Sequence, residues 1–131
     1  MTAEKEGFEM KITTTHIITD QDIDDLMVTA LEGGITGWCG KARIIKFPDW
    51  MEEEDKRLVL ASDIISRGGE IKLFDKESSD TWLLNKDMVL AGIKLYCEEF
   101  DETPTNVLEN LDADSADSII QLAIFKELTF S

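Results

Sequence analysis

Residues 11–34 read KITTTHIITDQDIDDLMVTALEGG, and this stretch passes from one kind of secondary structure to another. Lys11 to Ile18 is rich in β-branched residues, which favours a β-strand. From Asp20 to Glu32, apolar residues recur every three or four positions, which predicts an amphipathic helix. Thr19 and Asp22 have the spacing of a capping box at its start, and the two glycines that follow would end it. A strand followed directly by a helix predicts a mixed fold.

The next elements continue this alternation. Lys41 to Phe47 predicts a second strand, and Glu52 to Ser66 predicts a second helix with Leu58 on its inward face. Two short strands, Ile71 to Phe74 and Trp82 to Leu84, are separated by a polar turn and predict a hairpin. The hairpin favours antiparallel pairing over a doubly wound sheet.

Two further helices are expected in the second half of the chain. Asn85 or Asp87 would cap the first of them. The helical spacing of its apolar residues places Phe100 on its inward face. The other would run from about Asp112 or Asp114 to Phe125, and Leu128 to Phe130 could add an edge strand.

The sequence as a whole predicts a single α+β domain over residues 1–131, of which residues 1–10 could form a flexible N-terminal segment. We expect a mainly antiparallel sheet of about four to five strands, packed with about four helices. Hydrophobic residues make up 43% of the chain, which is enough to form a core despite the high charge.

The chain is strongly acidic. It carries 28 acidic and 13 basic residues, for a net charge of −15. Nucleic-acid phosphates are met by basic surface, so we expect no direct nucleic-acid binding unless the few cations are gathered at one site. No run of about 18 apolar residues marks a membrane span, and the first residues lack a secretory signal. We therefore expect a protein of the bacterial host cytoplasm that does not bind membranes.

The acidic residues occur in blocks, which makes them candidates for a surface that contacts a basic partner protein. Exposed tryptophan beside such a block could act as an interface anchor. The competing interpretation is a set of solvated faces, since acids in a first helical turn are matched to the helix dipole. The candidate partner-binding residues are Asp22, Asp24, Asp25, Trp50, Glu52, Glu53, Glu54, Asp112, Asp114 and Asp117.

No motif points to catalysis, a cofactor or a metal. His16 is the only histidine, and no companion marks a triad or a zinc site. The aspartates after Thr19 lack the glycine and the distal glutamate of a calcium loop. Cys39 and Cys97 lie in apolar contexts and are expected to be reduced and to pack as small hydrophobes. We expect a protein that is not an enzyme.

A glycine-rich loop, residues 33–43, offers an alternative site for a small anionic ligand. Gly37 would let the backbone approach the ligand, and Trp38 could stack on a base. Lys41 and Arg43 are two positions apart on a predicted strand and would point to the same side. The loop follows a helix, however, whereas phosphate-binding loops precede one, so a turn from helix to strand is the competing interpretation.

Four runs of the chain have a recognisable pattern, and these are residues 17–39, 65–69, 90–96 and 112–125. In these runs the chain resembles a family of small acidic proteins of phages, prophages and gut-bacterial mobile elements. The resemblance covers most of the chain and implies phage accessory biology. At Thr36-Gly37 the chain departs from the bulkier aromatic residue expected before the Trp-Cys pair.

The leading hypothesis is a phage protein that counters a host defence by binding. In its sharpest form, the acidic surface covers the nucleic-acid channel of a host nuclease, as some anti-CRISPR proteins do, and the association weakens with salt. A second hypothesis is an oligomer that sequesters a nucleotide immune signal around Trp38, Lys41 and Arg43. A third is a replication or packaging accessory that pairs with a basic phage protein.

Overall fold

The computed structural model describes residues 17–130. The predicted flexible segment 1–10, His16 and most of the predicted strand Lys11–Ile18 lie outside the described residues, and Ile17 and Ile18 belong to no regular element. The elements in chain order are α1 (Asp20–Thr29), the π-helical turn η1 (Ala30–Gly34), β2 (Cys39–Lys46), α2 (Glu53–Lys56), α3 (Ala61–Ile64), β3 (Glu70–Asp75), β4 (Thr81–Leu84), α4 (Lys86–Glu99), α5 (Pro104–Glu109) and α6 (Ala113–Phe125).

The α+β class and the antiparallel sheet are confirmed, with the strand order β2-β3-β4. Within residues 17–130 the sheet has three strands, fewer than the four to five expected. The predicted edge strand Leu128–Phe130 does not form, because the backbone of this segment is hydrogen-bonded to the side chain of Gln121 in α6. The Gln121 Oε1 atom accepts hydrogen bonds from the amides of Thr129 (2.8 Å) and Phe130 (2.7 Å).

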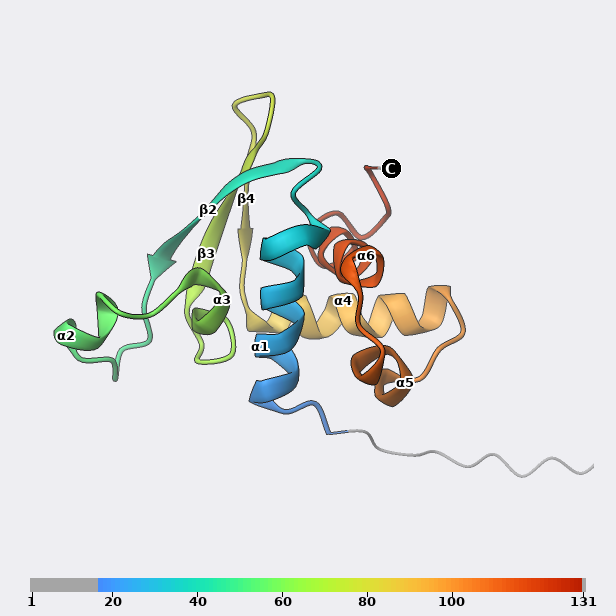
Figure 1. Ribbon diagram of the computed structural model, residues 1–131, viewed down its shortest axis with the longest axis horizontal. Coiled ribbons are helices and arrows are strands. Elements are labelled where there is room, and N and C mark those ends of the chain that lie inside the picture. The colour runs from blue at the N-terminus through green and yellow to red at the C-terminus, as the bar shows by residue number, and fades with distance from the viewer. Residues whose placement is uncertain (1–16, 131) are drawn as a thin grey trace, which may run out of the picture.

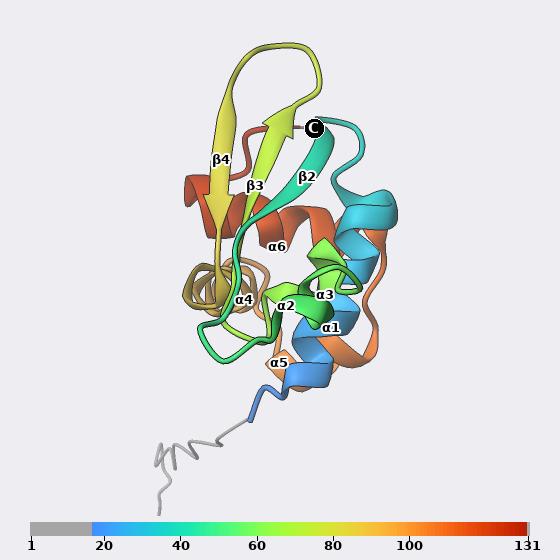
Figure 2. The same cartoon turned by 90° about the vertical axis from the view of Figure 1, so that its left-hand side faces the viewer.

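Within residues 17–130, helices cover one face of the sheet and none covers the other. Figure 2 shows the strands in front of α6, and α1 and α4 pack against α6 in turn. The inward sheet residues Ile71, Leu73 and Leu84 are fully buried, as are Ile23 of α1 and Ile120 of α6. Burying an aliphatic side chain of this size contributes about 1.5–3 kcal/mol, so these contacts hold the two layers together.

The predicted helix Glu52–Ser66 is wrong, because two short helices, α2 and α3, occupy this stretch. The break falls at Leu58, Val59 and Leu60, three consecutive apolar residues that cannot share one helical face. Leu60 is extended (φ −94°, ψ 158°) and its amide donates to Asp63. Leu58, predicted to face inward, is 81% exposed.

Helices α4, α5 and α6 form the far end of the molecule (Figure 1). Asn85 caps α4, and the predicted break at Thr103-Pro104 is the start of α5, where the Thr103 side chain accepts from the Asn106 amide. The split of the second helix and the addition of α5 give six α-helices in the described part of the chain, against about four predicted. Phe100, predicted to face inward, follows the end of α4 and is 44% exposed.

Candidate functional site

Two strongly exposed apolar side chains, Trp50 and Leu58, lie in the segment of the chain between β2 and α3. Trp50 is 66% exposed and Leu58 is 81% exposed, and both line a pocket of about 260 Å³ together with Met51 and Val59. We call these four residues the Trp50 patch. Leu60, which follows in the chain, is 65% exposed. A contiguous exposed apolar surface rimmed by polar residues is typical of an interaction site.

Charged residues surround the Trp50 patch. Asp55, Asp63 and Arg67 line the same pocket. The predicted partner-binding residues are exposed at the start of the adjoining helix α2, where Glu52 is the N-cap and Glu53 and Glu54 begin the helix. The Lys56 ammonium lies 2.9 Å from the carboxylate of Glu53 and neutralises part of this charge. From residue 49 to residue 67 the chain holds six acidic and three basic residues, so the rim is net negative.

The aspartates of α1 serve the fold. Asp22 and Thr19 form the predicted capping box, in which the Asp22 carboxylate accepts from the Thr19 amide at 2.9 Å. Asp24 accepts a 2.6 Å hydrogen bond from the hydroxyl of Ser66, which ties α1 to the end of α3. Asp25 accepts from the side chain of Gln21 one turn earlier.

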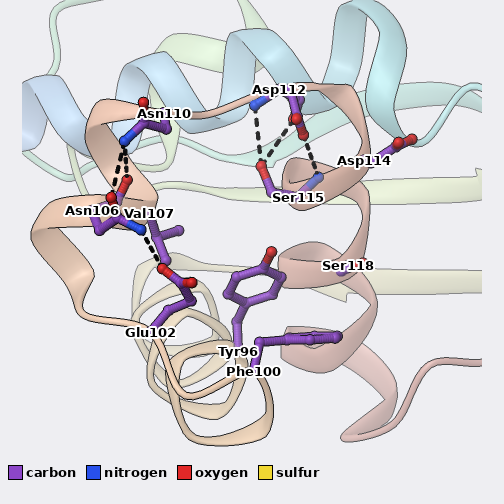
Figure 3. Close-up of a pocket in the computed structure, with 10 residues that line it drawn as sticks. All are labelled: Tyr96, Phe100, Glu102, Asn106, Val107, Asn110, Asp112, Asp114, Ser115 and Ser118. Atoms are coloured by element: carbon purple, nitrogen blue, oxygen red, sulfur yellow. Dashed lines mark hydrogen bonds between the residues drawn. The ribbon is translucent and has the colours of Figure 1, made fainter.

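A second acidic surface lies where α4, α5 and α6 meet. Its centre is a pocket of about 330 Å³, which we call the acidic pocket, and none of its ten lining residues is basic. Figure 3 shows the rings of Tyr96 and Phe100 on one side and Asp112 on the other, with the Tyr96 hydroxyl directed toward Asp112. Glu102 accepts a hydrogen bond from Asn106, and Asp114 lies at the pocket edge.

The acidic pocket keeps its charge near neutral pH. The backbone amide of Ser115 donates to Asp112 at 2.8 Å and holds the pKa of this carboxyl below its ordinary value. Burial, together with the charges of Asp112 and Glu102, raises the pKa of Tyr96. The pocket therefore presents carboxylates beside neutral aromatic rings, which suits a cationic side chain.

Trp38 and Asp117 contact each other in the interior and contribute to neither acidic surface. Trp38 is only 5% exposed, and its ring stacks on Phe130 at a centroid distance of 5.0 Å. The indole Nε1 donates to Asp117. Gly37 and Trp38 line a pocket of about 300 Å³ with Lys76, but Phe130 stacks on the Trp38 ring, so a base could stack on that face of Trp38 only by displacing Phe130.

Lys41 and Arg43 are separated from Trp38 by the sheet. Trp38 packs against Trp82 and Phe125 on the inner side, whereas Lys41 and Arg43 are exposed on the outer side. The structure therefore divides the residues that the sequence grouped as a ligand site.

Both cysteines are free. Cys39 is buried, as predicted, and Cys97 is half-buried. Burial raises the pKa of both thiols, which keeps them protonated and slow to react. Within residues 17–130, no group of three histidine, cysteine, aspartate or glutamate side chains could hold a metal ion. No helix in that part of the chain has the length and apolarity needed to cross a bilayer.

Comparisons with known proteins give no relative. No family model matches the chain, and no curated protein or solved structure matches it either. The geometry of the surfaces therefore carries the functional argument.

Sequence reasoning missed two features of these surfaces. The exposure of Leu58 follows from the break between α2 and α3, and the run of three apolar residues was the available signal. The sequence predicted that Tyr96 and Phe100 share a helix face, and their ring centroids are 4.6 Å apart, but it did not predict that the two rings form one side of the acidic pocket. The signal was the i, i+4 spacing of two aromatic residues next to a run of acids.

Proposed function

We propose that the protein acts by binding, as a phage-type accessory protein that counters a host defence, and that the Trp50 patch docks on a basic surface of its target. In the sharpest form of the proposal, the target is a host nuclease and the protein covers its nucleic-acid channel. The phage connection rests on the resemblance described above, and the docking surface rests on the geometry.

The exposure of Trp50 and Leu58 carries the proposal. Fully burying a side chain of this kind contributes about 1.5–3 kcal/mol, and this chain leaves both in water. An exposed tryptophan beside other apolar side chains and surrounded by charged residues is a typical anchor of a protein interface. Met51 and Val59 already shape the pocket from below, so a partner needs to supply only the covering apolar group.

The charge around the patch supports a basic target. Glu52, Glu53 and Glu54 project from α2 beside the apolar centre, which gives the arrangement of an apolar core inside a charged rim. Two copies of the chain facing each other through this patch would bring like charges together. A basic partner is favoured over a symmetric dimer for that reason.

The acidic pocket offers a second contact for the same kind of target. It is lined by residues of α4, α5 and α6, and in Figure 1 the helices α4 and α5 extend away from α2. An arginine or lysine side chain fits its chemistry, because the cation could lie against the ring of Tyr96 with Asp114 and Glu102 beside it.

The test is binding to a panel of RNA-guided and restriction nucleases at low and high salt. Trp50→Ala and Leu58→Ser should each weaken the complex by at least about tenfold, whereas Leu128→Ser, an exposed leucine elsewhere, should not. Glu52→Lys with Glu54→Lys should slow association at low salt, and the matched control Glu32→Lys with Glu77→Lys carries the same net charge.

Two results would overturn the proposal. One is a complex that is indifferent to salt and to the double reversal on α2. The other is a nuclease whose inhibition survives Trp50→Ala unchanged. Reversal at Asp24 is a poor test, because Asp24 holds Ser66 and its loss would disturb the fold.

A further inference from the structure

The outer face of the sheet carries a cationic surface that the proposed function does not use. Ile71 and Leu73 of β3 point inward. Because side chains alternate along a strand, Lys72 and Phe74 point outward. The strand register places Lys41 opposite Phe74 and Arg43 opposite Lys72. Figure 2 shows the sheet from this side, with α6 behind it.

These four residues, Lys41, Arg43, Lys72 and Phe74, form what we call the sheet platform. The Lys41 and Lys72 ammonium groups lie 4.7 Å and 5.9 Å from the centre of the Phe74 ring. Within residues 17–130, none of the three cations forms an ion pair. Their charge is therefore available to a ligand.

The acids closest to the platform in the chain are Asp75, Glu77 and Asp80, in the turn that follows Phe74. The Asp75 carboxylate accepts hydrogen bonds from the amides of Glu77 and Ser78, and Lys76 offsets part of the charge of this turn. Alternation along β3 places Glu70 on the same face, but it lies at the end of the sheet and opposite Lys46. The outward residues of β4, Thr81 and Leu83, are uncharged. The platform is a positive area in a chain whose net charge is −15.

We propose that the sheet platform binds single-stranded nucleic acid, with the backbone phosphates held by Lys41, Arg43 and Lys72 and a base stacked on Phe74. The Lys41 ammonium lies over the Phe74 ring in the free protein, so the base takes its place there as Lys41 turns to a phosphate. Adjacent strands are about 5 Å apart, so cations on β2 and β3 can contact the same phosphate or neighbouring ones. An open sheet face with an aromatic ring among cations suits unpaired bases, because every base offers a flat face for stacking.

The overall negative charge does not prevent this. Charges farther apart than about 8–10 Å are largely screened at physiological salt, and the acidic blocks at residues 22–25, 52–55 and 112–117 lie at helices α1, α2 and α6 and not on the sheet. The expectation that the chain avoids nucleic acid rested on its total charge. Clustering of the cations on one sheet face is the exception which that expectation allowed.

The test is fluorescence anisotropy with labelled oligothymidine and oligouridine of about 12 nucleotides, a length within the range of known single-strand sites. The logarithm of the affinity should fall with the logarithm of salt concentration with a slope of about −2, as three phosphate contacts on a single strand predict. Arg43→Gln with Lys72→Gln should weaken binding by about tenfold and flatten this slope.

A matched control separates local contacts from total charge. Arg57→Gln with Lys94→Gln removes two exposed cations from helical parts of the molecule and should change affinity by less than about threefold. Phe74→Leu should weaken binding because it removes the stacking ring, and Phe74→Trp should retain it. Unchanged thermal unfolding would show that the variants fold.

Four outcomes would overturn the inference. They are no binding at low salt, equal binding by Phe74→Leu, equal binding of duplex DNA, and equal binding of a polyglutamate chain of similar length. The last would assign the platform to an acidic protein segment. The inference is independent of the Trp50 patch, because Trp50→Ala should leave binding to the oligonucleotide unchanged.

Discussion

The indole Nε1 of Trp38 donates a 2.7 Å hydrogen bond to Oδ1 of Asp117, which lies 79 residues further along the chain. The same carboxylate oxygen accepts a 3.0 Å hydrogen bond from the side chain of Gln121. Gln121 in turn holds the backbone of Thr129 and Phe130, and Phe130 stacks on Trp38. This series of contacts links the loop before β2 to the C-terminal segment through one face of α6.

Loss of the Asp117 carboxylate should destabilise the fold. In Asp117→Ala the buried indole N–H of Trp38 has no acceptor, which costs about 1–3 kcal/mol, and Asp117→Asn should cost less because its amide oxygen can still accept. Urea unfolding measures the change. Asp114→Ala, an exposed neighbour on the same helix, should stay within about 0.5 kcal/mol. Equal effects of the two alanine variants would contradict this assignment.

Gln121→Ala should release the C-terminal segment while leaving the sheet intact. The amides of Thr129 and Phe130 would lose their acceptor and exchange with solvent faster. Hydrogen exchange read by NMR gives the result residue by residue. Amides of β3, such as that of Leu73, are the internal control and should keep their protection. Unchanged protection at Thr129 would contradict the prediction.

Gly92 should tolerate no side chain, because α4 and α6 cross closely there. A Cβ atom at this position would lie 2.6 Å from the backbone oxygen of Ile119 and 2.8 Å from the Cβ of Ala123. Gly92→Ala should therefore destabilise the protein by about 1–3 kcal/mol. Gly37→Ala, where no atom lies within 4 Å, is the control in the same unfolding measurement. A neutral Gly92→Ala would mean that the helices can separate at little cost.

The stability should fall in acid partly through Asp112. Its pKa is lowered in the folded protein because the ionised carboxylate accepts hydrogen bonds from Ser115. The stabilisation is therefore fully present above the ordinary pKa of 3.8 and is lost as the pH falls through the folded value. Asp112→Asn keeps a capping oxygen without this titration, so its unfolding free energy should depend less steeply on pH in that window.

Unfolding curves from neutral to acid pH for wild type, Asp112→Asn and Ser118→Ala test this. Ser118 lines the same pocket and does not titrate, so its variant should follow the wild-type slope. A wild-type slope in the Asp112→Asn variant would remove Asp112 from the acid response.

The sequence predicted the elements that are specified locally. The capping box of Thr19 and Asp22, the apolar stripe of α1 and the strand pair around residues 71–84 each depend on neighbours in the chain, and each is present. The prediction of a single helix over Glu52–Ser66 failed because the helical period was matched from Leu58 onward without weighing the run of three apolar residues that begins there.

The candidate sites were less predictable, since they depend on contacts between distant segments. No neighbour of Asp117 in the chain indicates that its carboxylate accepts a hydrogen bond from Trp38. An acid that was expected at the surface therefore has an interior partner. Lys41 and Arg43 were expected to share a side, and both are exposed, but only the register with β3 reveals Lys72 and Phe74 as their neighbours. The exposure of Trp50 next to acidic residues could be predicted, because these residues adjoin each other in the chain.

The three tryptophans give the molecule a built-in optical reporter. Trp38 is enclosed by aromatic rings, Trp82 is half-buried beside it, and Trp50 stands in water. Replacing the first two by phenylalanine would leave Trp50 as the sole indole emitter. The wavelength of its emission maximum and its quenching by acrylamide would then report whether a partner covers Trp50, without an attached dye.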